Sequence, residues 1–127
     1  MKLYFAIIFI ALNSAFGFGQ TAEFDFLGNT TIKWDKTPEG EILKHYFVFI
    51  NTGDVPLVID DAEVACSCTK VDFPKKPIAP KSKDSILVAF NTEGKFYNQD
   101  RKIILKANTK KQEKLRLKVY VIPKDEK

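Results

Sequence analysis

Apolar and polar residues alternate along most of the chain, which indicates extended strands. The clearest run is 114–123, in which Leu115, Leu117, Val119 and Val121 alternate with lysine, arginine and tyrosine. A period of two places successive side chains on opposite faces of a strand. This run therefore predicts a strand with one buried face. The same alternation predicts strands within five further runs, 22–28, 41–53, 55–66, 83–92 and 101–109, and a short piece at 31–34.

Turn-forming residues separate these runs, and no segment shows a helical period. In the run 41–53 both faces carry apolar side chains, so we expect that strand inside a sheet. Asn51-Thr52-Gly53-Asp54 predicts a hairpin turn. The adjacent runs near the C-terminus predict antiparallel hairpin pairing. Together the pattern predicts an all-β protein, an antiparallel two-sheet sandwich of about seven strands.

The first nineteen residues have a different pattern. A basic residue, Lys2, precedes the unbroken apolar run 3–12, and small residues follow. That order is typical of a secretory signal peptide, and the run is about half the length of a membrane-spanning helix. We therefore expect a signal peptide at 1–19, cleaved after Gly17 or Gly19, and one domain at 20–127. The mature protein is then exported, to the periplasm, the cell surface or the medium, without a membrane span; an uncleaved tether is the alternative.

Charge and the other polar residues do not identify a ligand. The chain has 127 residues and a net charge of +4, with lysines spread along its strands and loops, a pattern that argues against nucleic-acid binding. His45, the only histidine, alternates in phase with two phenylalanines and is interpreted as a core residue. Asp60, Asp61 and Glu63 lack the spacing of a calcium loop and predict a solvated strand end. The sequence predicts no catalytic residue, no resident metal and no cofactor.

Several stretches resemble one bacterial family. The segment 49–59, "FINTGDVPLVI", resembles its Asn-Thr-Gly-Asp-x-Pro-Leu-x-Ile motif, and "CSCT" at 66–69 stands where the family carries Cys-Gly-Cys-Thr. The segment 77–94, "PIAPKSKDSILVAFNTEG", follows its Pro-Ile-x-Pro-Gly pattern. The family is domain of unknown function 1573. The resemblance implies an exported immunoglobulin-like sandwich that works by binding other proteins, with no general enzymatic activity. Two positions depart from the family: Ser67 and Lys81 each replace a glycine.

The two cysteines, Cys66 and Cys68, allow three interpretations. In an extended strand their Cα atoms would lie about 6.6 Å apart, so a disulfide requires a turn at Ser67. Such a strained bridge over a very short loop would be easy to reduce, as a redox-active pair is. Two thiolates on one face could instead bind Cu(I). The third interpretation is two small buried side chains without chemistry.

We therefore expect an exported, non-enzymatic immunoglobulin-like module that is a protein-binding or structural component of the cell envelope. Its partner and oligomeric state are not specified by the sequence. The alternative is a thiol-based redox or Cu(I)-handling module that uses Cys66 and Cys68. The segment after Cys68 is too long and proline-rich for a tight hairpin, and loops often carry function. The predicted contact loop consists of Thr69, Lys70, Asp72, Phe73, Pro74, Lys75 and Lys76.

Overall fold

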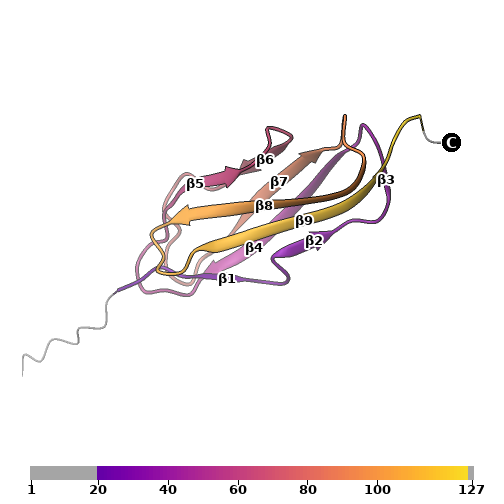
Figure 1. Cartoon of the computed structure of the whole chain (residues 1–127). Helices are drawn as coiled ribbons and strands as arrows, with labels where there is room; N and C mark the ends of the chain where they lie inside the picture. Colours follow the sequence, from indigo (N-terminus) through magenta and orange to yellow (C-terminus); the bar gives the residue numbers. More distant parts are fainter. Residues whose placement is uncertain (1–19, 126–127) are drawn as a thin grey trace, which may run out of the picture.

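The computed structural model describes residues 20–125, and the predicted signal peptide at 1–19 lies outside these residues. The described part is all-β, as predicted (Figure 1). It contains no helix long and apolar enough to cross a membrane. Its strands are β1 (Phe24–Phe26), β2 (Thr31–Lys33), β3 (Thr37–Pro38), β4 (Ile42–Asn51), β5 (Ile59–Val64), β6 (Thr69–Asp72), β7 (Lys83–Asn91), β8 (Tyr97–Ala107) and β9 (Glu113–Ile122).

The strands form two sheets that pack face to face. One sheet has the order β1-β4-β7-β6 and is antiparallel throughout. The other has the order β2-β9-β8-β5, with β3 also paired to β9. In this second sheet β8 pairs antiparallel with β9, as expected, and also with β5, whereas β2 and β3 run parallel to β9. The prediction of an antiparallel sandwich is therefore correct for one sheet and needs correction for the other, which is mixed.

The inner faces of the two sheets form one core. On β9 the predicted alternation is confirmed, because Leu115, Leu117, Val119 and Val121 are all buried while the residues between them are half-buried. The facing side chains of the other sheet come mainly from the two strands at its centre, β4 and β7. They are Phe47, Phe49, Ile86, Val88 and Phe90. The run 41–53 therefore supplies an interior strand, as its two apolar faces predicted.

Two strands were not predicted, so residues 20–125 contain nine strands rather than about seven. β3 is only two residues long and contains Pro38, which lacks the N–H that a central strand needs. β6 lies in the segment that was expected to be a loop. Its four residues alternate between inward and outward side chains, but the alternation is too short to stand out in the sequence.

The stretch from Asn51 to Asp54 is not a hairpin turn, which corrects the expectation from its composition. It connects β4 in one sheet to β5 in the other, so the strands that flank it do not pair. Glycine is required at position 53 because there is no room for a side chain, and not because of its backbone angles. A Cβ atom on Gly53 would lie 2.0 Å from the carbonyl oxygen of Thr21 and 2.6 Å from the Cα atom of Ala22. The N-terminal residues of the domain therefore pack directly on this connection.

Candidate functional site

The two cysteines lie in the turn that carries the chain from β5 in one sheet to β6 in the other. Their sulfur atoms are 2.07 Å apart and form a disulfide, and their Cα atoms are 5.2 Å apart. The Thr69 N–H donates to the Cys66 carbonyl at 3.2 Å, and the Cys68 N–H donates to Cys66 Sγ at 3.1 Å. The turn at Ser67 that a bridge requires is present, and Ser67 keeps a negative φ. Serine therefore needs no left-handed conformation at this position.

The strand that follows the disulfide is an edge strand. The Asn91 N–H donates to the Cys68 carbonyl at 2.9 Å. In the antiparallel register, Lys70 and Asp72 then also direct their backbone groups toward β7. Val71, between them, directs its N–H and C=O away from β7. Within the part of the chain that the structure describes, no strand pairs with that side of β6.

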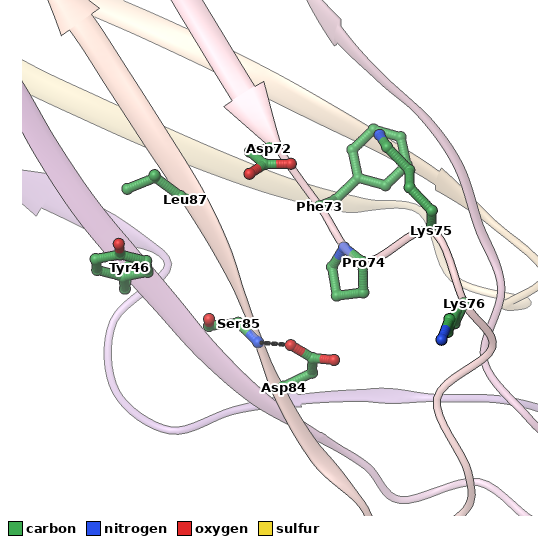
Figure 2. Close-up of a pocket in the computed structure, with 9 residues that line it drawn as sticks. All are labelled: Tyr46, Asp72, Phe73, Pro74, Lys75, Lys76, Asp84, Ser85 and Leu87. Atoms are coloured by element: carbon green, nitrogen blue, oxygen red, sulfur yellow. Dashed lines mark hydrogen bonds between the residues drawn. The ribbon is translucent and has the colours of Figure 1, made fainter.

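An open hollow of about 430 Å³ lies on the outer face of the four-stranded sheet, beside the end of β6 (Figure 2). Asp72, Leu87 and Tyr46 are register partners across β6, β7 and β4, so their side chains lie in one row on the solvent face. The Lys75 Nζ atom lies 3.3 Å from the centre of the Phe73 ring, a cation–π contact. The lining residues are Tyr46, Asp72, Phe73, Pro74, Lys75, Lys76, Asp84, Ser85 and Leu87.

The structure divides the predicted contact loop into two parts. Thr69 to Asp72 form strand β6, because their backbone groups pair with β7, and only the residues after Asp72 form a loop. The Thr69 side chain is buried, whereas Lys70 is exposed on the outer face. The remaining predicted residues, Asp72, Phe73, Pro74, Lys75 and Lys76, all line the hollow.

Four residues of the hollow were missed by the sequence reasoning: Tyr46, Asp84, Ser85 and Leu87. Tyr46 and Leu87 lie on strands that were predicted, on the faces opposite the core. The available signal was a large apolar side chain on a polar face. Tyr46 is 60% exposed despite its aromatic ring. The sequence does not show which strands are neighbours, and only that register brings Tyr46 beside Leu87.

The other polar residues that the sequence singled out lie apart from this hollow. The half-buried His45 ring packs edge-on against Phe47, with ring centres 4.6 Å apart. Glu63 is exposed on β5 and forms an ion pair with Lys106 at 2.6 Å. The hydrogen bond from this pair raises the Lys106 pKa above its ordinary value of 10.5. Among residues 20–125, no group of three or more His, Cys, Asp or Glu side chains is placed to hold a metal ion.

The fold is similar to several solved structures. A protein of unknown function from Porphyromonas gingivalis W83 has a TM-score of 0.69 at 15% identity, covering 80% of this chain and 47% of that one. PapD-like domain 7 of human CEP192 has a TM-score of 0.61 at 10% identity, over 84% of this chain and 88% of that domain. The periplasmic chaperone SfaE has a TM-score of 0.55 at 16% identity, over 80% and 58%. The present chain spans about half the length of the Porphyromonas protein.

At these identities the likeness concerns the fold, and it confirms the predicted immunoglobulin-like sandwich. No curated protein matches the chain. A family model described as "Protein of unknown function (DUF1573)" matches residues 25–121, which includes most of β1 to β9. The Asn-Thr-Gly, Cys-x-Cys and Pro-Ile segments all lie inside that match. The chain therefore belongs to the DUF1573 family.

Proposed function

We propose that this protein is an exported, non-enzymatic module of the cell envelope that binds an extended segment of another protein along β6. The observation that carries the proposal is the free backbone edge at Val71, directly beside the hollow on the outer sheet face. An added strand would pair with the Val71 N–H and C=O, which the fold itself does not use. A side chain of that strand would enter the hollow. Backbone pairing gives affinity in this mode, and the side-chain pocket gives specificity.

The other long edge of the sandwich is less suited to strand addition. β5 has a register shift between Ile59 and Asp61, and it presents the exposed carboxylates of Asp60, Asp61 and Glu63. Bulges and charges are the devices by which proteins block their edges. β6 pairs with β7 in continuous register and is followed directly by an aromatic residue, Phe73. The contrast between the two edges favours β6.

Two further observations support the rest of the proposal. The likeness to SfaE, a periplasmic chaperone, agrees with a protein partner and with a location outside the cytoplasm. Residues 1–19 have the pattern of a signal peptide. Both cysteines are engaged in the bridge, and His45 packs on Phe47, so the described residues offer no nucleophile paired with a histidine.

Peptides selected from a random displayed library against residues 20–127 would test strand addition. We expect Val71→Pro to lower the affinity of the domain for the selected peptides by at least about tenfold, because the substitution removes one free N–H without breaking the pairing with β7. Val71→Ala keeps the N–H and should retain binding. Circular dichroism checks that both variants fold. The proposal would be contradicted if the Val71→Pro variant bound every selected peptide as tightly as the unchanged domain does.

Export is tested separately, by the intact mass of the protein recovered from the cell envelope or medium. We expect a chain that begins after Gly17 or Gly19. A full-length chain that stays in the cytoplasm would contradict this part of the proposal.

A further inference from the structure

A second hollow, of about 550 Å³, lies beside the disulfide on the five-stranded sheet. Cys66 forms part of its wall, together with Ala65 from the same turn. The remaining lining residues come from β8 and β9. They are Asp100, Arg101, Lys102 and Arg116.

The charge of this hollow is predominantly positive. It has three cationic side chains, and its single carboxylate, Asp100, is already bound to Arg116 at 2.8 Å. Arg101 donates to the Gln99 side chain at 2.7 Å, which holds its guanidinium in place. The Lys102 side chain is exposed. The hollow therefore favours a ligand with negative charge.

The two sulfur atoms have different surroundings. Cys66 faces the basic hollow, whereas Cys68 packs partly against the core, and its Sγ atom lies 3.8 Å from the Thr69 hydroxyl oxygen. A disulfide sulfur has no proton to give, so the Thr69 hydroxyl is the donor in this contact. Thr69 is buried, which keeps the hydroxyl in position. An incoming thiol can therefore reach Cys66, while the neighbouring sulfur has a ready hydrogen-bond donor.

We propose that Cys66–Cys68 is a thiol–disulfide exchange site for small thiols that carry an additional negative charge. The thiolate of such a molecule attacks Cys66 Sγ from the basic hollow. The Cys66–Cys68 bond breaks, and its electron pair goes to Cys68 Sγ, which becomes a thiolate that accepts the Thr69 hydrogen bond. The product is a mixed disulfide at Cys66. A second thiolate attacks the outer sulfur of that mixed disulfide and releases a small-molecule disulfide and the Cys66 thiolate.

The reaction transfers two electrons from two small thiols to the protein disulfide. The Cys66 thiolate forms beside a predominantly basic lining, which favours the ionised sulfur. The proposal does not depend on strand addition at β6, so either can fail alone. It assigns the reactive role to Cys66 and a positioning role to Thr69.

Reduction kinetics of the mature protein with three thiols of different charge test the proposal. The probes are 2-mercaptoethanesulfonate, 2-mercaptoethanol and cysteamine, with rates expressed per thiolate. At low ionic strength we expect the sulfonate to react roughly tenfold faster than cysteamine, because the basic hollow concentrates the anion. The preference should fall strongly in about 1 M salt, where screening acts over about 3 Å. Equal rates for the three thiolates would overturn the proposal.

Two pairs of variants locate the effect. Lys102→Gln should reduce the preference for the sulfonate about threefold, whereas Lys110→Gln, which removes the same charge from the β8–β9 turn, should leave it unchanged. Thr69→Val should lower the rate of disulfide reduction by all three thiols by a similar factor, whereas Thr69→Ser, which keeps the hydroxyl, should retain the original rate. A loss of charge preference in Lys110→Gln equal to that in Lys102→Gln would contradict a role for the hollow.

Trapping with iodoacetamide followed by fragment-ion mass spectrometry identifies the attacked sulfur. We expect the mercaptoethanesulfonate adduct on Cys66 and the carbamidomethyl group on Cys68. The opposite distribution would overturn the assignment. Failure of the folded protein to react until denaturant is added would overturn the site itself.

Discussion

The side-chain Nδ2 atom of Asn51 lies 3.0 Å from the carbonyl oxygen of Ile78, and the Asn51 side chain is fully buried. The same nitrogen donates to the Val55 carbonyl at 2.8 Å. Its Oδ1 atom accepts the Gly53 N–H at 2.9 Å and the Glu23 N–H at 3.2 Å. One amide thus joins the start of the domain, the β4–β5 connection and the segment before β7. Backbone hydrogen bonds also join these segments: Leu57 and Ile78 exchange two at 2.8 Å, and the Thr52 N–H donates to the Glu23 carbonyl at 3.0 Å. The Asn51 side chain adds a buried link at the point where all three segments meet.

We expect Asn51→Ala to lower the free energy of unfolding by roughly 3 kcal/mol, because it leaves buried carbonyl and N–H groups without partners. Asn51→Asp should cost more, since a carboxylate cannot donate to the two carbonyl oxygens. Urea denaturation of residues 20–127 measures both changes. Thr52→Ala, at the exposed neighbouring position, is the control and should stay within about 0.5 kcal/mol. An Asn51→Ala domain as stable as this control would show that the amide is not needed.

The strand faces could be predicted from the sequence because they follow from local alternation. Leu117 and Val121 are buried, as their positions in the run 114–123 predicted. The sequence around Asn51 could not be interpreted in the same way. Its composition is that of a hairpin turn, but the sheet to which the next strand belongs depends on contacts such as the bond to Ile78, 27 residues away. Short-range turn chemistry contains no information about that choice.

The candidate binding site was predictable only in part, for a similar reason. Phe73 and Lys75 follow one another closely in the chain, and both belong to the contact loop that was predicted from the proline-rich segment and line the hollow. Tyr46 and Leu87 complete it from strands far apart in sequence. The basic hollow beside Cys66 was missed because Lys102 and Arg116 had been interpreted only as the solvated faces of strands. The pairing of β8 with β9 brings these two residues together.

Lys81 has a left-handed backbone, with a φ of 67°, at the position where the family pattern has glycine. A side chain makes this conformation costly by about 1–2 kcal/mol, while glycine adopts it readily. The Lys81 N–H also donates to the Asn51 carbonyl at 2.7 Å, so the turn cannot relax without losing that bond. We expect Lys81→Gly to stabilise the domain by about 0.5–1 kcal/mol, after the greater freedom of glycine in the unfolded chain is subtracted.

Thermal and urea denaturation measure this gain. Lys81→Ala is the matched control, because it removes the same charged group but retains a Cβ atom, and we expect no gain from it. Equal stabilisation by alanine and glycine would assign the effect to the lysine side chain rather than to the backbone. A loss of stability in Lys81→Gly would contradict the cost assigned to this φ.

The Glu39 carboxylate, which precedes β4, accepts hydrogen bonds from the turn after β7 and from the segment after β9. These bonds make the stability of the domain depend on pH. The Lys124 N–H donates to one carboxylate oxygen at 3.1 Å and the Gly94 N–H to the other at 2.9 Å. These bonds hold the pKa of Glu39 below its ordinary value of 4.5, and the Lys124 charge lowers it further. The ionised form is therefore favoured by folding. Its contribution is complete above pH 4.5 and is lost as the pH falls through the lower pKa of the folded protein.

We expect Glu39→Gln to be less stable than the natural domain at pH 7, and the difference should shrink as the pH falls below 4.5. Urea denaturation at pH 7, 5, 4 and 3 measures this convergence. Glu41→Gln removes the same charge from a nearby exposed carboxylate that makes no ion pair within the described residues, and it should show no such convergence. If the difference in free energy of unfolding between Glu39→Gln and the unchanged domain stayed constant with pH, the variant would be destabilised by altered packing or geometry. The charge-dependent hydrogen bonds would then not be its cause.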